Sequence, residues 1–284
     1  MNTAIGSLSF EQSALVGTLV VDFAIQLVGW LVSSVLQTDK LYDLLGSTTF
    51  IVLAVGTLAY AGRNTARSVI ATILVCLWAL RLGGFLFFRV LKSGSDSRFD
   101  EAKKKPGTFL VYWALQGVWV WVTLLPVIIV NSSSRDLQRV LWTDVVGLAL
   151  WVLGFILEVT ADFQKYAFKQ IPANKGRFID TGVYKFARYP QYGGEILVWL
   201  GVWLFCTPVF QGADWASVVS PVCVASLLLF VSGVPIQERQ AQERWGADPA
   251  YQAWRARAWL LFPLGPRWWT KQPGSTAGGG VQSS

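Results

Sequence analysis

Seven long apolar runs dominate this sequence and limit the folds that are open to it. A helix that crosses the roughly 30 Å apolar core of a bilayer needs about 20 predominantly apolar residues. The runs at 44–62, 108–130 and 215–236 contain no Asp, Glu, Lys or Arg, which is typical of membrane helices. We therefore predict an all-α fold, a polytopic membrane helix bundle. Its expected spans are 14–36, 44–62, 68–88, 108–130, 144–161, 193–210 and 215–236.

The Lys and Arg residues between these runs are distributed unevenly across the membrane. Nineteen fall in the loops on one side, four fall on the other side, and Arg81 lies inside a run. Cytoplasmic loops carry the excess of Lys and Arg, so the N-terminus is predicted to lie outside and the C-terminus in the cytoplasm. Because the net charge of +7 is concentrated in these loops, membrane lipids are the expected partner and nucleic acid is not.

Composition also restricts the chemistry. The chain has no His, which removes imidazole as a general base or metal ligand, and its three Cys lie within apolar runs without metal-binding spacing. No metal site is predicted. One integral-membrane domain is expected over 1–272, with a cofactor-binding half at about 140–265. The Gly- and Ser-rich segment 273–284 is expected to be a disordered tail.

Ionisable residues inside membrane spans are costly and are therefore candidates for function. Arg81 interrupts an apolar run, where it either binds a phosphate or carboxylate of a ligand or pairs with an acid of the bundle. Glu158 and Asp162 are four residues apart and share one helix face. They either pair with Lys165 and Lys169 or receive the ribose and amide groups of a ligand.

The stretch 162–195 is interpreted as a loop at the membrane surface, and it combines cations, Tyr and Gly. A solvated basic loop explains the cations but not the glycines, which let the backbone approach a ligand closely. Lys175 and Arg188 can neutralise phosphate, and Tyr184 and Tyr192 offer a stacking face with a hydroxyl. This combination predicts a pocket for a cofactor that carries a nucleotide.

Three further segments leave two interpretations each. Asp43 either caps the helix that begins near it or helps Tyr42 to donate a proton. Asp22 in the first run either lines the same cavity or extends toward the membrane surface. The amphipathic segment 238–255 either lies on the membrane or covers the cofactor.

Ordered motifs over about 40–265 resemble an uncharacterised membrane family related to steroid 5-alpha-reductases. The matching pieces are Trp78-Ala79-Leu80-Arg81-Leu82-Gly83, Ser97-Arg98-Phe99-Asp100, Asp162-Phe163-Gln164, Pro172-Ala173-Asn174-Lys175-Gly176, Thr181-Gly182, Arg188 with Pro190-Gln191-Tyr192-Gly193-Gly194-Glu195, and Val231-Ser232-Gly233-Val234-Pro235 with Glu238. The resemblance implies that the C-terminal half binds NADPH and that hydride passes to an activated C=C bond. It implies an endoplasmic reticulum location in a eukaryotic host.

The resemblance, together with the residue patterns above, defines a set of candidate cofactor-binding residues. They are Arg81, Glu158, Asp162, Lys169, Asn174, Lys175, Tyr184, Arg188, Gln191, Tyr192 and Glu195. Three of the positions compared depart from the reductase pattern. Tyr189 and Gln191 stand where the family has His and Asn, and Glu158 stands where the reductases have Asn.

The same loop also resembles a second family, the isoprenylcysteine carboxyl methyltransferases, which use S-adenosylmethionine. The shared pattern consists of Gly182, Tyr184, Arg188, Pro190, Tyr192 and Gly194. Arg81 and the segments 162–164 and 172–176 favour the reductase, and NADPH with its diphosphate and 2′-phosphate suits many cations.

The expected function is therefore an NADPH-dependent membrane reductase of a C=C bond in a lipid-soluble enone, either sterol-like or isoprenoid-like. Tyr42 with Asp43, or Glu195 as a protonated acid, are the candidate catalytic proton donors. A methyltransferase that acts on a membrane-borne substrate and a non-catalytic lipid-binding scaffold are the alternatives.

Overall fold

A computed structural model of the chain describes residues 9–62, 64–93, 99–135, 137 and 139–262. Contacts divide the chain into two compact units. Unit 1 comprises 1–155 and 195–228, and unit 2 comprises 156–194 and 229–284. The predicted tail at 273–284 and the first two residues of the Ser97–Asp100 motif lie outside the described residues.

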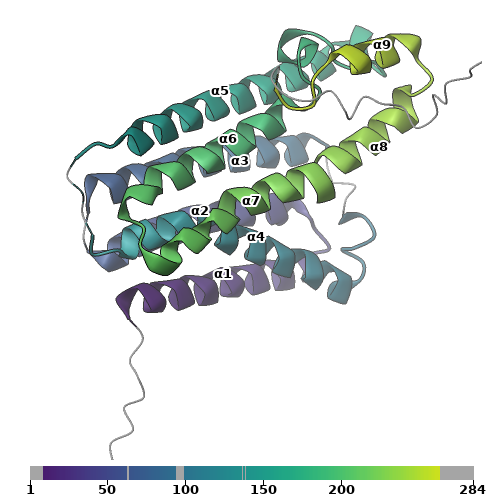
Figure 1. The fold of residues 1–284 in the computed structure, drawn as a ribbon. Coiled ribbons are helices and arrows are strands. Elements are labelled where there is room, and N and C mark those ends of the chain that lie inside the picture. Colours follow the sequence, from purple (N-terminus) through teal and green to yellow (C-terminus); the bar gives the residue numbers. More distant parts are fainter. Residues whose placement is uncertain (1–8, 63, 94–98, 136, 138, 263–284) are drawn as a thin grey trace, which may run out of the picture. The chain divides into compact units, whose positions relative to one another are not determined.

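Unit 1 is a helix bundle in which α1, α2, α3 and α4 run side by side (Figure 1). Its helices are α1 (Phe10–Val35), α2 (Lys40–Ala61), α3 (Ala66–Ser93), α4 (Pro106–Ser132), the first half of α5 (Trp142–Gln170), most of α6 (Pro190–Cys206) and α7 (Val219–Ser226). The short 3₁₀ helices η4 (Thr207–Val209) and η5 (Gly212–Val218) connect α6 to α7. Of the candidate spans, α4 is the most deeply buried.

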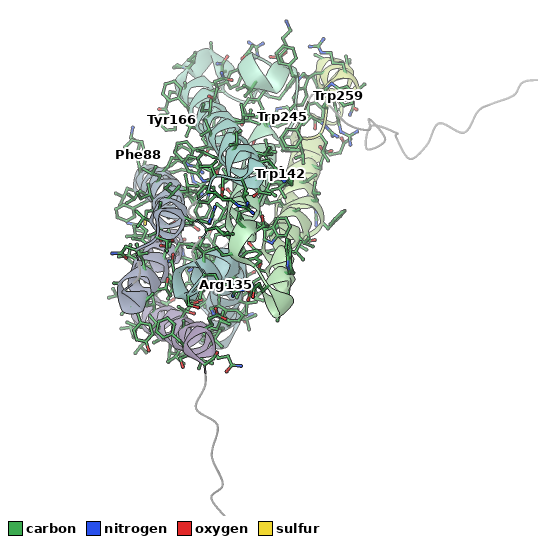
Figure 2. All side chains as sticks on the ribbon, turned by 60° about the vertical axis from the view of Figure 1, so that its left-hand side comes forward. Phe88, Arg135, Trp142, Tyr166, Trp245 and Trp259 are labelled. Atoms are coloured by element: carbon green, nitrogen blue, oxygen red, sulfur yellow. The ribbon has the colours of Figure 1, made fainter. Side chains whose placement is uncertain are left out.

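The predicted all-α membrane bundle is confirmed. Seven helical segments of the described chain are long and apolar enough to cross a membrane, and each overlaps one predicted run. Large apolar side chains such as Phe88 remain exposed on the helices, where lipid would cover them (Figure 2). The orientation of the termini stays a prediction.

Local sequence signals set several helix ends. Ser9 and Gln12 form a reciprocal capping box that begins α1. Gly62 ends α2 with φ of 62°, a left-handed conformation that glycine adopts without a steric penalty. Pro106 begins α4 at a position where the missing N–H has no helical partner.

An aromatic core holds unit 1 together. Phe50, Trp78 and Trp199 are almost completely buried, and the ring centroids of Trp78 and Trp199 are 4.8 Å apart in an edge-to-face arrangement. Phe50 lies 5.0 Å from Trp78 and 5.5 Å from Trp199. Such contacts contribute beyond area burial, so α2, α3 and α6 are fixed to one another through these three rings.

Unit 2 contains the second half of α5, the 3₁₀ turns η2 (Pro172–Asn174) and η3 (Gly182–Lys185), α8 (Val234–Trp245) and α9 (Pro249–Arg257). Phe178, Tyr251 and Trp254 form its aromatic core, with Trp245 packed against them. The indole of Trp245, labelled in Figure 2, donates to the carbonyl of Gly176 at 2.6 Å. The loop that carries the motifs is thereby attached to α8 and α9.

The interpretation of 162–195 as one loop was wrong at both ends. The helix α5 continues to Gln170 because no Gly or Pro occurs between 155 and 171, and Pro172 follows its end. Pro190 begins α6 at the other side. Only 171–189 remains outside these helices, so Asp162, Lys165 and Lys169 lie on a helix.

The C-terminal amphipathic segment is two helices. After the break that follows α8, Asp248 caps the start of α9 by accepting a hydrogen bond from the Ala250 N–H at 2.8 Å. Pro249 is the first residue of α9. Tyr251 and Trp254 on α9 are buried, and the Trp254 indole donates to the Tyr184 carbonyl at 2.9 Å. The aromatic face of α9 therefore packs on the motif loop of its own unit.

Candidate functional site

The motif loop of unit 2 is organised around the carboxylate of Glu238. Arg188 donates from Nη1 to Oε1 at 2.5 Å, and the Tyr189 hydroxyl donates to the same oxygen at 2.8 Å. Arg255 donates from Nε and Nη2 to Oε2 at 3.1 and 2.8 Å. Hydrogen bonds from a guanidinium to a carboxylate are charge-assisted and therefore strong. One acid on α8 therefore fixes the end of the loop and the end of α9.

Tyr184 is the second fixed point of the loop. Its hydroxyl lies 3.2 Å from Gln191 Oε1 and 3.3 Å from the Ala161 carbonyl. Burial raises the pKa of Tyr184 well above its ordinary value, and the negative charge of Asp162 adds to the shift. The hydroxyl is therefore a neutral donor across the physiological pH range, and it connects the loop to both α5 and α6.

Tyr189 and Tyr192 stack at the start of α6, with centroids 5.8 Å apart and planes inclined by 24°. Burial raises the pKa of Tyr189 as well, and the adjacent Glu238 carboxylate adds to the shift. Tyr189 and Gln191 both depart from the reductase pattern, and both make hydrogen bonds inside unit 2. These departures therefore stabilise the motif loop.

Glycines in the loop make close approaches to side chains of the same unit. Gly182 has φ of 60°, and a Cβ there would collide with the Gln164 amide, which accepts from the Val183 N–H at 2.9 Å. Gly193 likewise packs on the Phe262 ring. The expected close approach of backbone therefore exists, and in the described residues it accommodates Gln164 and Phe262.

The predicted cations of unit 2 differ in exposure. Lys169 and Lys175 are exposed, whereas Arg188 is buried. Asn174 donates from Nδ2 to the Phe168 carbonyl at 3.0 Å and so connects the loop to α5. Glu158 is buried and Asp162 is half-buried on α5, four residues apart as predicted. Tyr184, Arg188, Gln191 and Tyr192 are thus brought together, and Lys169 and Lys175 remain at the surface.

Four predicted residues belong to unit 1. Glu195 on α6 accepts from the Trp199 indole at 3.0 Å and from the Trp78 indole at 3.3 Å, so both carboxyl oxygens are held beside the aromatic core. Arg81 is half-buried on α3. Tyr42 donates its hydroxyl to the Tyr112 carbonyl at 3.0 Å.

Of the two interpretations of Asp43, the helix cap was wrong. The helix α2 begins at Lys40, one turn earlier, and Asp39 is the residue before its first turn. Asp43 instead lies within that turn, where its Oδ2 is 3.9 Å from Nη2 of Arg89 on α3. Asp43 and Arg89 thus connect two neighbouring helices.

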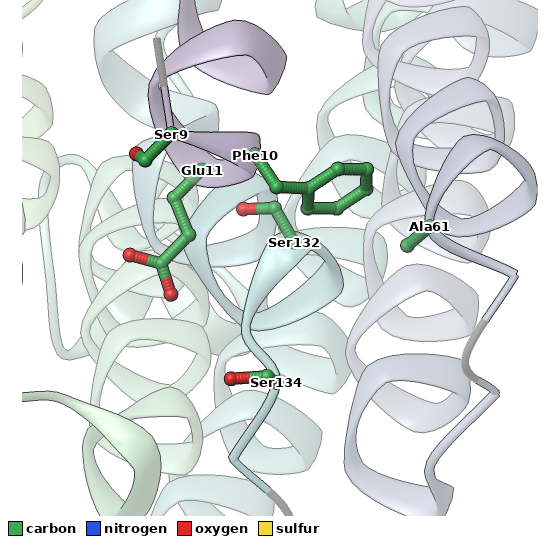
Figure 3. A pocket seen from close by; sticks show the side chains of 6 residues that line it. All are labelled: Ser9, Phe10, Glu11, Ala61, Ser132 and Ser134. Carbon is green, nitrogen blue, oxygen red and sulfur yellow. The ribbon is translucent and has the colours of Figure 1, made fainter. Parts of the chain in front are cut away.

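Two hollows open at one end of unit 1, and their lining residues include none of the predicted site residues. The first, of about 290 Å³, is lined by Ser9, Phe10, Glu11, Ala61, Ser132 and Ser134 (Figure 3). The second, of about 670 Å³, surrounds Arg135, which pairs with Glu11 and Asp214. These hollows lie outside the motif loop and do not coincide with the candidate site.

Sequence reasoning missed two residues of the site, the acid that pairs with Arg188 and the second arginine that pairs with that acid. Glu238 was noticed only as part of a motif, and Arg255 only as part of an amphipathic segment, yet both determine where the loop lies. The available signal was Arg188 itself, because a buried guanidinium requires an acidic partner. Nothing in the spacing identified which acid would supply it.

Residues 29–258 match the sequence profile of a family described as a protein of unknown function, DUF1295. The match includes every candidate cofactor-binding and catalytic residue. No curated protein and no solved structure matches the chain.

Proposed function

The chain belongs to the DUF1295 family, and we propose that it is an NADPH-dependent membrane reductase of a C=C bond in a lipid-soluble enone, with a sterol-like or isoprenoid-like substrate. The proposal includes a distant relationship of this family to the steroid 5-alpha-reductases. It also includes an N-terminus outside, a C-terminus in the cytoplasm and, in a eukaryotic host, residence in the endoplasmic reticulum.

The observation that carries the proposal is the ordered, cation-rich motif loop of unit 2. Lys175, Arg177 and Lys185 are exposed on this loop, and Lys and Arg outnumber Asp and Glu among the described residues of the unit. Arg188 Nε is buried and has no hydrogen-bond partner within the described residues. Three phosphate groups of one ligand would match this excess of donors and charge, so the residues fit NADPH.

Each residue has a limited role in this mechanism. NADPH, when bound, supplies the hydride that reaches the β-carbon of the enone. Lys175 and Lys169 would neutralise phosphate, and Tyr184 and Gln191 would hold the loop in one conformation. The Tyr42 hydroxyl donates to the Tyr112 carbonyl at 3.0 Å. During the reaction it would give up this hydrogen bond and donate its proton to the substrate. The Glu195 carboxyl, fixed by two indoles, is the second candidate donor.

The decisive experiment measures thermal stabilisation of the detergent-purified protein by NADPH, NADH and S-adenosylmethionine in parallel. A ligand that binds only the folded state raises the melting temperature. We expect NADPH to stabilise the protein more than NADH does, because its 2′-phosphate is one further anionic group that the exposed Lys and Arg side chains can bind. Absence of any NADPH effect would overturn the proposal.

A matched pair of variants tests the role of the loop cations. Lys175→Ala should weaken NADPH binding by about tenfold, equivalent to about 1.4 kcal/mol, and leave the melting temperature of the free protein unchanged. Lys104→Ala is the control, because Lys104 is also exposed and pairs with Glu101 on a different loop. Equal NADPH affinities in the two variants would remove Lys175 from the site.

One observation favours a second candidate function, methyl transfer from S-adenosylmethionine to a membrane-borne substrate. The charge of Arg188 is already balanced by Glu238 in unit 2, which leaves this residue less available to a diphosphate. S-adenosylmethionine has no phosphate and does not need that charge. Selective stabilisation by S-adenosylmethionine would therefore favour methyl transfer over the reductase function.

A further inference from the structure

A polar cluster lies inside the apolar part of unit 1, among α1, α2 and α4. Asp22 accepts from Gln26 Nε2 at 3.0 Å through Oδ1, and the same nitrogen lies 3.4 Å from Thr49 Oγ1. Gln116 donates to Gln26 Oε1 at 2.9 Å and to the Tyr42 carbonyl at 3.1 Å. Three helices thus contribute a carboxylate, two amides and a hydroxyl to one place.

This cluster is far from both ends of the helices. Asp22 is at the midpoint of α1, about 18 Å from its start at 1.5 Å per residue, and Thr49 is near the middle of α2. The exposed fraction of Asp22 and of Thr49 is 0%. The cluster is therefore at the depth where a membrane is least able to hydrate a charge.

Two glycines make room for the cluster. A Cβ at Gly46 would come within 2.9 Å of the Gln116 amide carbon, and a Cβ at Gly117 would lie 3.1 Å from Gln26 Cγ and 3.6 Å from Asp22 Oδ1. Larger side chains at these positions would displace the amides. The packing of α1, α2 and α4 is therefore adapted to the polar side chains.

The charge of Asp22 has no compensating cation in the described part of unit 1. The helix α1 packs mainly on α2 and α4, and α4 contains no charged residue. Other than Asp22, the charged residues of these three helices are Glu11, Lys40 and Asp43, all in the first turn of a helix. Asp22 forms no ion pair within the described residues, unlike Asp43 with Arg89.

Protonation alone does not satisfy this carboxyl group. A proton on Oδ1 would face the N–H of Gln26, which already donates there. A proton on Oδ2 would find no acceptor, because Oδ2 is buried without a hydrogen-bond partner in the described residues. An ionised Asp22 would leave an uncompensated charge, which is far more costly. Both protonation states therefore require something else at Oδ2.

We infer that the Asp22 carboxylate and the Thr49 hydroxyl oxygen, which the Gln26 amide N–H holds near each other, bind a sodium ion within the membrane. A monovalent ion balances one carboxylate, whereas a divalent ion would leave an excess positive charge at this depth. Carboxylate and hydroxyl oxygens are hard donors of the kind that such cations prefer, and the Gln26 and Gln116 amides keep the hydrogen bonds that position them. Water completes the coordination. The site shares no residue with the proposed cofactor site of unit 2.

The test measures sodium binding to the full-length protein in detergent, without any cofactor. Melting temperature is followed while sodium chloride replaces choline chloride at constant ionic strength, and bound radioactive sodium is counted in parallel. We expect the melting temperature to rise by a few degrees in sodium, with a smaller rise in potassium, and stoichiometric sodium binding. A wild-type protein that neither binds sodium nor responds to it would overturn the inference.

Matched variants locate the site. Asp22→Asn should abolish sodium binding, and Glu11→Gln, the same chemical change on the same helix, should leave it intact. Thr49→Val should weaken binding several-fold because one oxygen is lost, and it decides the question if Asp22→Asn does not fold. Sodium binding that persists unchanged in both Asp22→Asn and Thr49→Val would place the ion elsewhere and refute the assignment.

Discussion

Asp22 in unit 1 and Glu238 in unit 2 are acids in candidate membrane spans with opposite surroundings. Glu238 receives two guanidinium groups and a phenol hydroxyl from its own unit. Asp22 receives one amide N–H, and one of its oxygens has no partner in the described residues. Glu238 is thus compensated by the fold, whereas Asp22 requires a bound species for compensation.

The difference shows which buried charges indicate binding. An acid that is surrounded by arginines stabilises a loop and is a positioning residue, because its charge is already balanced. An acid that the protein leaves unbalanced at mid-membrane depth is a candidate for binding an ion or a ligand. The donors and cations around each oxygen separate the two cases.

The largest effect is expected for Glu238→Gln. Removing this charge leaves Arg188, whose side chain is 2% exposed, next to Arg255 without an anion. Breaking such a pair from one side should destabilise the protein by about 3 kcal/mol, measured as a fall in melting temperature. Glu243→Gln on the same helix is the control, because the side chains of Glu243 and Arg239 are 62% and 82% exposed, and their loss should cost under about 0.5 kcal/mol. Equal falls in the two variants would contradict the role of Glu238.

A smaller effect is expected for Gly46→Ala in unit 1. The new methyl group would press on the Gln116 amide and disturb the polar cluster, at a cost of about 2 kcal/mol in thermal unfolding. Gly56→Ala in the same helix meets no atom within 4 Å and should stabilise the protein by about 0.5 kcal/mol. If both substitutions stabilise, the close packing around Gln116 is wrong.

The smallest effect is expected for Tyr189→Phe, and it depends on pH. Burial raises the pKa of Tyr189, so its neutral phenol contributes stability below about pH 10, the ordinary value, and loses it as the pH rises through the raised pKa. The variant should lose about 1 kcal/mol at neutral pH with the hydrogen bond to Glu238, and its stability should decline less steeply in alkali. Parallel pH profiles of melting temperature for the two proteins would show that Tyr189 does not contribute to the alkaline loss.

Much of the fold was predictable because the long apolar runs of the sequence identify the membrane spans. Each apolar run corresponds to a helical segment, of which the last includes η5, α7 and the start of α8, since backbone groups in lipid must bond within the segment. The ends were less predictable. The cations, tyrosines and glycines of 162–195 suggested a loop, but helix formers continue α5 to Gln170, and Pro172 follows its end.

The candidate site was predictable in its residues and not in its pairings. The motif pattern selected Tyr184, Arg188, Gln191 and Tyr192, which do come together in unit 2. The candidate site residues did not include Glu238 or Arg255, because these residues lie on helices that begin more than 40 residues after Arg188. Spacing along a chain carries no information about such contacts.

Sequence alone thus determined that this protein is a membrane helix bundle with a basic, aromatic motif loop. The length of an apolar run and the position of the charges between runs depend only on residues that are close together along the chain. Tertiary structure alone decided which charges are balanced. Glu238 lies in a polar, amphipathic segment and Asp22 in an apolar run, and neither setting in the sequence identifies the partner of the acid. Only the packing of neighbouring helices brings arginines to one and amides to the other, since electrostatic compensation depends on distance in space and not on distance along the chain.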